Sequence, residues 1–567
     1  MGGVVLETLS TKKLLILLGI LLVCQIVFFL IGGKIAPSPS SAVSVLGTWC
    51  VDKNYPVKQD EWSFSRSDLK DGKGCDSVAG YSDPKIKAKS IKAEEIVFTF
   101  QLPLPRDDVK LDYSRWFQNF LTVLQLDVEY DELNKMGDNP VMKMDIRLGY
   151  RNKWDPPDTW TELARSDETR ALDCSIDEVH KIAGYYYNCS LLSLFELGSC
   201  HHDYYLVNIR LPTWDFLRKT PQNDHIGKLV DLHLITIHQN GGFTKVWFSL
   251  KTTLFPILLT VLIWFWRRVS ILDRPPNLLE KMLLALGCSL SFLNLPIEWL
   301  TLTVNMPFML LLTDIRQGIF YAMLMCFWII FAGEHLMDLT VDLETIVHKS
   351  KDQVERNKLV LYWKHLSAVA GGCICLFVFE MCERGVQLYN PFFSIWVTDI
   401  GTKLALAFVI MAGIAASMYF FFLSWMIYLV FRNISAKKSA LPEMTKARRK
   451  YYLGLILRFK VLMLTTLLCA AMTVIFFIIS QVSEGQWKWD EDITLEYTSA
   501  FFTGVYGMWN VYVFALLSLY APSHKYKPVS QTGADGSDGS NEEEVEFTQL
   551  STEQSSLAHF TQKAAAS

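Results

Sequence analysis

Two opposite charges lie inside one long apolar stretch of this chain. Asp314 and Arg316 fall about a quarter of the way along MPFMLLLTDIRQGIFYAMLMCFWIIFAG, residues 306–333, which is otherwise typical of a membrane span. A carboxylate in hydrocarbon is costly unless a cation, a hydrogen-bond donor or water faces it. Arg316 is too close in sequence to face Asp314 from the same side of a helix. We therefore expect the partner of Asp314 to come from another helix or from water.

Polar side chains recur at helical spacing in other apolar stretches, and each set falls on one face of a helix. The sets are Gly287, Ser291, Asn294, Glu298 and Thr301; Asp314, Gln317 and Tyr321; and Ser499, Thr503, Tyr506 and Asn510. Gly504 and Gly507 lie beside the last set and would allow a close helix contact. Glu380 and Arg384 have the spacing of an ion pair within one helix. We expect these faces to turn toward a shared interior; the alternative is that they only hold the helices together.

None of these residues forms the constellation of an enzyme. A hydrolase or an acyltransferase needs a nucleophile beside a histidine or an acid, and no such motif is present. His201/His202 and Glu334/His335 lack the spacing of metal ligands, and there is no glycine-rich phosphate loop. A formal charge of −4 over 567 residues gives no reason to expect a nucleic-acid partner. We predict a protein that is not an enzyme and uses no metal or cofactor; no internal repeat supports a transporter.

Membrane helices must position these polar faces. The mean hydropathy is +0.21, and long apolar runs alternate with charged segments, which is typical of a multi-pass α-helical membrane protein. We expect about eight spans, at 14–31, 246–266, 282–302, 307–333, 366–382, 404–430, 461–479 and 500–520. The first run is longer than the core of a cleavable signal peptide and is interpreted as a retained anchor; cleavage near Ala42 is the alternative.

Lysine and arginine fall mostly on one side of the membrane if the spans alternate, and that side is expected to be the cytosol. The clusters are Lys12/Lys13, Arg267/Arg268, the set from Lys349 to Lys358 and the dense set from Arg432 to Lys460. Both termini would then be cytosolic, and the polar interior would open to the lumen. The predicted divisions are a cytosolic N-terminus (1–13), a first helix (14–33), a lumenal or extracellular domain (34–245), a seven-helix bundle (246–520) and a disordered acidic cytosolic tail (521–567).

The lumenal domain has the pattern of an antiparallel β-sandwich. Five segments are rich in β-branched and aromatic residues and are separated by Pro, Gly, Asp and Asn: 94–102, 121–130, 141–150, 204–211 and 230–238. Asn188 begins a glycosylation sequon within this domain, whereas the second sequon, at Asn433, lies on the cytosolic side.

Five cysteines lie in this domain, where an oxidising compartment would favour disulfides. Sequence proximity favours pairs of Cys50 with Cys75 and of Cys174 with Cys189, which leaves Cys200 free or shared. The connectivity is open at this point, because spacing alone does not determine it.

Long motifs along the chain resemble the Wntless family, the cargo receptors of secreted Wnt proteins. In the apolar part they include FLNLPIEWLTL (292–302), LLTDIRQGIFYAML (311–324), CERGVQLYNPFFSIW (382–396) and TSAFFTGVYGMWNVYVFALL (498–517). In the β-rich part they include LDYSRWFQN (111–119), FELGSCHHDYYLVNIR (195–210) and IHQNGGFT (237–244). The resemblance extends from the first span to the start of the tail.

The resemblance implies a GOLD-like β-domain on a seven-helix bundle similar to that of G-protein-coupled receptors, preceded by one extra helix. It also implies that the protein, embedded in membrane lipids, binds lipid-modified Wnt in the endoplasmic reticulum or Golgi and carries it to the cell surface. Retromer and clathrin adaptors would return it through endosomes. An acyl chain of about 16 carbons would bury ~10 kcal/mol or more of hydrophobic free energy in a pocket of the bundle.

Polar side chains at the mouth of that pocket would meet the acyl ester and the cargo backbone. Our candidates for the mouth are Asn294, Glu298, Asp314, Arg316, Gln317, Tyr321, Tyr506 and Asn510. The alternative is that these residues fix the arrangement of the helices.

One cytosolic segment has the pattern of a sorting signal. Tyr452-Leu453-Gly454-Leu455 fits Y-x-x-Φ in the predicted third cytosolic loop, where the family carries its endocytosis signal. Tyr452 as an interfacial anchor is the alternative.

A signalling receptor of the G-protein-coupled kind is the alternative function, because fold alone does not determine function. That class would carry Asp/Glu-Arg-Tyr and Asn-Pro-x-x-Tyr motifs at set helix positions. Asn390-Pro391 falls instead in a predicted lumenal loop, and Val511 follows Asn510.

Overall fold

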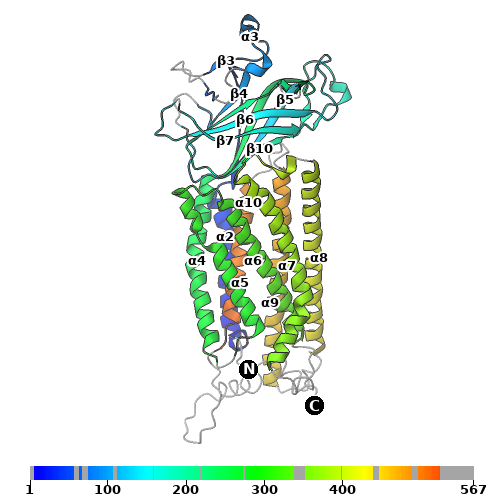
Figure 1. Cartoon of the computed structure of the whole chain (residues 1–567). Helices are drawn as coiled ribbons and strands as arrows, with labels where there is room; N and C mark the ends of the chain where they lie inside the picture. The colour runs from blue at the N-terminus through cyan, green and yellow to red at the C-terminus, as the bar shows by residue number, and fades with distance from the viewer. Residues whose placement is uncertain are drawn as a thin grey trace, which may run out of the picture.

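A β-domain lies on one end of a long helical bundle in the computed structural model of the chain (Figure 1). The structure describes residues 5–55, 63–66, 75–105, 111–157, 159–215, 219–272, 275–337, 351–397, 399–437, 446–486 and 496–523. The predicted tail therefore lies almost entirely outside the described residues.

The β-domain is an antiparallel sandwich of two sheets, as the sequence predicts. The described strands of one sheet run in the order β1 (Ser40–Leu46), β14 (Lys228–Gln239), β5 (Gln118–Glu129) and β10 (Leu192–Ser199). The other sheet has the order β3 (Asp76–Val78), β2 (Thr48–Val51), β4 (Ile96–Leu102), β11 (Tyr204–Arg210), β6 (Val141–Arg151) and β7 (Thr161–Ala171). Two short pairs, β8 (Cys174–Ser175) with β9 (Asn188–Cys189) and β12 (Trp214–Asp215) with β13 (Thr220–Pro221), complete the strands, and α3 (Pro84–Lys89) is a short helix.

The core of this domain lies between the two sheets because apolar residues alternate along the strands. In β5 every second residue from Phe120 to Val128 is buried and all but Thr122 are apolar, while the residues between them are at least partly exposed. The five predicted strands correspond to β4, β5, β6, β11 and β14 within two or three residues at each end. Strands β1, β2, β3, β7 and β10 were not predicted; β7 is an edge strand with mostly exposed charged residues and no apolar alternation.

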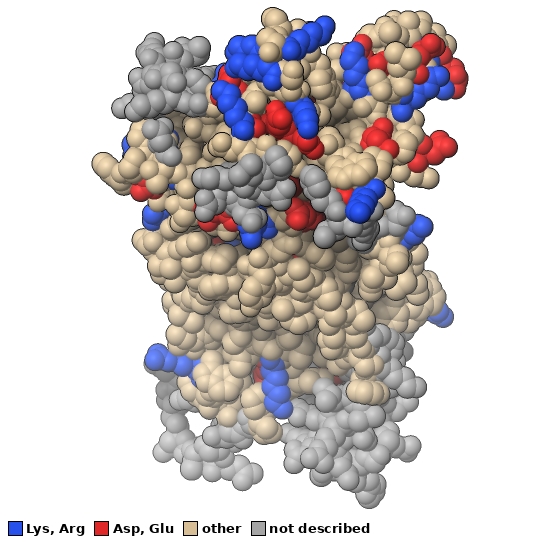
Figure 2. Space-filling model, turned by 45° about the horizontal axis from the view of Figure 1, so that its top comes forward, with Lys and Arg blue, Asp and Glu red and all other residues tan. Residues whose placement is uncertain are grey.

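Long helices form the bundle, and they lie side by side below the β-domain in Figure 1. They are α2 (Thr11–Leu30), α4 (Gly241–Ser270), α5 (Leu278–Asn294), α6 (Met309–Met337), α7 (Lys351–Gln387), α8 (Asp399–Lys437), α9 (Lys446–Gln486) and α10 (Glu496–Leu519). Among the described residues, seven of these helices, all but α7, contribute an apolar segment long enough to cross a membrane; for α5 that segment continues beyond the helix to Leu302. In Figure 2 the charged residues gather on the β-domain and near the opposite end, and the band between them is mostly uncharged.

The N-terminal helix α2 is an integral part of the bundle. It packs along α10, and the short helix α1 (Val5–Thr8) donates a hydrogen bond from the Val5 N–H to the carbonyl of Ala521 (2.9 Å). A Cβ on Gly504 would overlap the ring of Phe29, and a Cβ on Gly507 would overlap that of Phe28. The two glycines therefore allow the close helix approach that the sequence predicts, with α2 as the partner.

Two disulfides are present in the β-domain, Cys50–Cys75 and Cys174–Cys189. These are the pairs that sequence proximity favours. Cys200 is a free and buried thiol whose pKa is raised by burial, so it packs as a small apolar residue. Asn188 is exposed on β9, which leaves its sequon accessible.

We predict that Gly504→Ala and Gly507→Ala each destabilise the protein by about 1–3 kcal/mol, because the added methyl group pushes α2 away from α10. The measurement is the apparent melting temperature in detergent. Gly413→Ala in α8 is the matched control, since a Cβ there meets nothing within 4 Å. The control should be neutral or slightly stabilising, as glycine is unfavourable in a helix. Equal melting of all three variants would contradict the packing role.

Candidate functional site

A buried ion cluster joins three segments at the β-domain end of the bundle. Glu298, on the 3-10 turn Ile297–Leu302 that follows α5, accepts from Lys251 of α4 and Arg316 of α6 through the same oxygen, Oε1. The distances are 2.5 Å to Lys251 Nζ and 3.0 Å to Arg316 Nη1. All three side chains are buried, and Glu298 Oε2 has no hydrogen-bond partner in the described part of the chain. Two cations face one carboxylate, so the cluster carries a net positive charge when all three are ionised.

Arg316 also completes the hydrogen bonding at the C-terminal end of α5. Its guanidinium donates to the carbonyls of Phe292 (2.8 Å), Leu293 (2.5 Å) and Leu295 (2.6 Å). The last carbonyls of a helix lack partners within the helix, and Pro296 has no N–H with which to continue the chain of bonds. Four oxygen atoms, three backbone carbonyls and Glu298 Oε1, accept from the Arg316 guanidinium, which is why it can be fully buried.

The predicted amide and phenol residues form a second buried network. Asn294 Nδ2 donates to Asn510 Oδ1 (2.6 Å), and the Tyr506 hydroxyl donates to Asn294 Oδ1 (2.7 Å). Asn510 Nδ2 donates in turn to the Tyr506 carbonyl at 2.9 Å. This network joins α5 to α10, and its side chains satisfy one another.

Asp314 has its partner on another helix, as the sequence analysis expects. Arg384 of α7 lies with Nε 3.8 Å from Asp314 Oδ2, and its Nη1 lies 2.5 Å from Glu196 Oε1 on β10. Arg384 thus connects α6, α7 and the β-domain. The side chain of Glu380, the other expected partner of Arg384, lies outside the described residues. On α6 itself, Gln317 Nε2 donates to the Tyr321 hydroxyl (2.9 Å).

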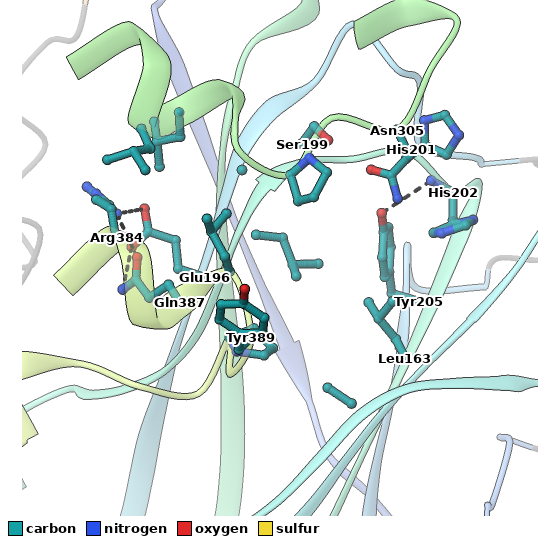
Figure 3. A pocket seen from close by; sticks show the side chains of 18 residues that line it. Leu163, Glu196, Ser199, His201, His202, Tyr205, Asn305, Arg384, Gln387 and Tyr389 are labelled. Atoms are coloured by element: carbon teal, nitrogen blue, oxygen red, sulfur yellow. Dashed lines mark hydrogen bonds and ion pairs between the residues drawn. The ribbon is translucent and has the colours of Figure 1, made fainter. Parts of the chain in front are cut away.

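A pocket of about 240 Å³ lies beside Arg384, where the β-domain meets the bundle. That volume is well above the roughly 10–15 Å³ that holds one water molecule. Figure 3 shows Arg384, Glu196 and Gln387 at one side of the pocket and His201, His202 and Asn305 at the other. Apolar lining comes from Leu310 and Leu311 of α6 and from Leu388 after α7.

Both histidines of the pocket have a lowered pKa, and His202 is neutral over the pH range of most compartments. Burial lowers the pKa of His202 to about 4 and also lowers the pKa of His201, because the charged imidazole loses hydration. His202 stacks on Tyr150 with ring centroids 3.7 Å apart. The ionic character of the pocket therefore comes from Arg384 and Glu196.

The segment between α7 and α8 fixes one wall of the pocket to the β-domain. Phe392 is buried in the β-domain core, 5.9 Å from Phe195 between ring centroids. The Phe392 carbonyl accepts from Arg170 Nη2 (3.0 Å), and the Glu196 N–H donates to the Pro391 carbonyl (3.0 Å). Tyr389 in the same segment is almost fully exposed at the pocket rim.

The eight predicted mouth residues gather at the β-domain end of the bundle, but none of them lines this pocket. Their contact with a cargo stays a prediction. Lys251 was not among the predicted residues, although a lysine inside an apolar run is itself a signal, and the pairing of Arg384 with Glu196 was not predicted either. Tyr452 and Leu455 lie within helix α9 rather than in a loop, and their side chains are outside the described ones.

Comparisons with known proteins cover the whole chain. Residues 48–239 match the family model described as Wntless, GOLD domain, and residues 240–524 match Wntless-like, transmembrane domain. "Protein wntless" of Drosophila virilis is 49% identical over 584 residues, with 100% of both chains covered. "Protein wntless homolog" of Mus musculus is 50% identical over 537 residues, with 94% of each chain covered.

We predict that Arg316→Met lowers stability by about 3–5 kcal/mol, because it leaves the α5 carbonyls without donors and removes one of two cations from Glu298. The measurement is the apparent melting temperature of the purified protein. Arg432→Met on the exposed surface of α8 is the matched control and should melt within about 1 °C of the parent, since surface changes cost little. An Arg316→Met variant as stable as this control would contradict the assigned role.

Proposed function

Because this chain belongs to the Wntless family, we propose that it is a cargo receptor that binds lipid-modified Wnt proteins and carries them from the endoplasmic reticulum and Golgi to the cell surface. The observation that supports this best is the relation to the wntless proteins over the full chain, at about half identity. Such identity over both the β-domain and the bundle favours a conserved role for the two parts together.

The pocket between the β-domain and the bundle supports the proposal on chemical grounds. An acyl ester on a protein has an apolar tail beside polar carbonyl groups, so its carrier needs an apolar slot with a few polar groups at the rim. Leu310, Leu311 and Leu388 provide apolar lining, and Arg384 and Gln387 lie beside them. In this proposal the acyl chain enters the bundle from the β-domain side, and the β-domain holds the protein part of the cargo.

The orientation follows from the distribution of basic residues. We propose that the bundle end opposite the β-domain is cytosolic, with both chain termini there, because Lys12/Lys13 and Arg267/Arg268 lie at that end. The β-domain would then face the lumen and later the cell exterior. Its two disulfides and the exposed Asn188 suit that environment.

Recycling would need a signal on the cytosolic side. We propose that the Tyr452–Leu455 segment recruits clathrin adaptors and that retromer returns the receptor from endosomes. Since the segment lies at the N-terminal part of α9, an adaptor would have to take it up from a helix end that can fray.

We predict that a Wnt protein lacking its acyl chain no longer co-purifies with this receptor, because it cannot use the ~10 kcal/mol of hydrophobic free energy of the chain. The measurement compares co-purification of acylated and acyl-deficient Wnt from the same cells. Cells lacking the receptor should also secrete little Wnt into the medium. Equal recovery of both Wnt forms, or unimpaired secretion, would contradict the proposal.

Filling the pocket provides a test on the receptor side. We predict that Leu311→Trp reduces Wnt co-purification at least about tenfold, because the larger side chain takes the space of the acyl chain. Ile319→Trp on the same helix is the matched control, since Ile319 is exposed on the outer face of α6. Both variants should reach the membrane in equal amounts. Reduced Wnt co-purification with both variants, or unchanged co-purification with both, would argue against this pocket as the acyl site.

A further inference from the structure

Charged residues at the far end of the bundle locate the apolar layer on α4 and α6. Hydrocarbon is about 30 Å thick, which corresponds to ~20 residues of helix at 1.5 Å each. Counting back from Arg267, near the end of α4, gives Trp247; counting back from Glu334 of α6 gives Asp314. Both counts end near the ion cluster of Lys251, Glu298 and Arg316, since Lys251 Nζ lies 5.7 Å from the centre of the Trp247 ring and Asp314 is two residues from Arg316. The residues between α5 and α6 therefore lie at the edge of the hydrocarbon, where it meets the lipid headgroups.

This connection, residues 295–308, exposes a row of large apolar side chains. Trp299 is 40% exposed, Leu300 52%, Val304 56% and Phe308 45%. The row adjoins α4 through Trp299, which bonds to Thr252, and α6 through Phe308, which directly precedes Met309; exposed residues further along these helices include Ile257 and Ile319. Packing within the chain leaves all four side chains at least 40% exposed, so it does not by itself explain the row.

The polar neighbours of the row are those of a membrane interface. Trp299 Nε1 donates to Thr252 Oγ1 of α4 (2.8 Å), and its ring meets the edge of Trp116 from the β-domain, 5.6 Å away. Lys245 Nζ lies 5.4 Å from the centre of the Trp116 ring. Amphipathic tryptophans with a lysine nearby are typical of the headgroup layer, where the ring is in apolar surroundings and the N–H is hydrogen-bonded.

The connection is also held rigidly enough to act as an anchor. Arg115 Nη1 donates to the Leu302 carbonyl (3.0 Å), and Gln118 Nε2 donates to Thr301 Oγ1 (3.4 Å). Arg115 and Gln118 belong to the β-domain, so the connection is fixed from above by that domain and from the side by α4. The apolar side chains of the connection are therefore exposed only on its outer side.

We propose that the α5–α6 connection is an interfacial anchor whose row of Trp299, Leu300, Val304 and Phe308 binds phospholipids of the leaflet on the β-domain side. The partner is the lipid bilayer itself, because the row continues the surface by which the helices meet lipid. The same connection contributes Asn305 and Pro307 to the wall of the pocket, and Leu310 and Leu311 follow directly on α6. The anchor thus holds the pocket at headgroup depth, whether or not the pocket takes an acyl chain.

The test places the photoreactive residue p-benzoylphenylalanine at Leu300 or Val304 in the full chain, reconstituted in phosphatidylcholine vesicles. After irradiation, mass spectrometry measures the fraction of protein that carries one phospholipid. The same residue at Ile319 of α6 is the positive control. At Leu133, which is 92% exposed on the β5–β6 loop, it is the negative control for an exposed apolar position in water.

The expected result is a phospholipid adduct at 300 and 304 within about threefold of that at 319, and at least about tenfold less at 133. Protein is normalised to the fraction that resists alkaline extraction, so a variant that fails to insert is not counted. Adducts at 300 and 304 as low as at 133, with a normal adduct at 319, would overturn the proposal. An adduct with a co-purifying protein in place of lipid would overturn it as well, since the row would then be a protein interface.

Discussion

The need to satisfy polar groups where water is absent is the constraint on which this structure depends. Helix α5 ends below the β-domain at Asn294, and Pro296 prevents its continuation. In a bilayer the carbonyls left at such an end require donors from the protein. Arg316 supplies them, and its charge in turn requires Glu298, which also binds Lys251. One helix end therefore explains why a cation lies in an apolar span, and it determines how α4, α5 and α6 meet.

The same logic extends from the bundle to the β-domain. The chain segments at the junction carry backbone groups that no helix or sheet satisfies, and side chains of the opposite domain bind them: Arg115 binds the Leu302 carbonyl and Arg170 binds the Phe392 carbonyl. Phe392 adds an apolar contact in the core of the β-domain. Because the Arg170 bond is buried and Phe392 is packed in the core, the two domains form a defined junction. The pocket is the space that this junction leaves open.

Much of this architecture could be predicted from local patterns. Period-two alternation identified β5 and β14, and apolar length identified the spans, since both signals come from residues close in sequence. β7 was missed because the more buried positions of this edge strand, 164, 166, 168 and 170, carry mostly polar or charged side chains, so there is no apolar alternation to detect. The pairing of Asp314 with Arg384 was predicted only as a need for a partner. Arg384 is the partner because α6 lies against α7, and Glu196 binds Arg384 because β10 lies next to them. Neither placement is contained in a local sequence pattern.

The hydrogen bonding of the polar residues bears on which of them can recognise a ligand. Asn294, Tyr506 and Asn510 already bond to one another, so a ligand that bound them would first have to break buried hydrogen bonds that cost about 1–3 kcal/mol each to leave unmade. Arg384 is partly exposed and Tyr389 almost fully so, and both line the pocket. These two residues can bind a ligand without first breaking a hydrogen bond of the buried network. Rim residues of the junction are therefore better suited to recognise cargo, while the buried network is better suited to hold the helices at the spacing that the pocket requires.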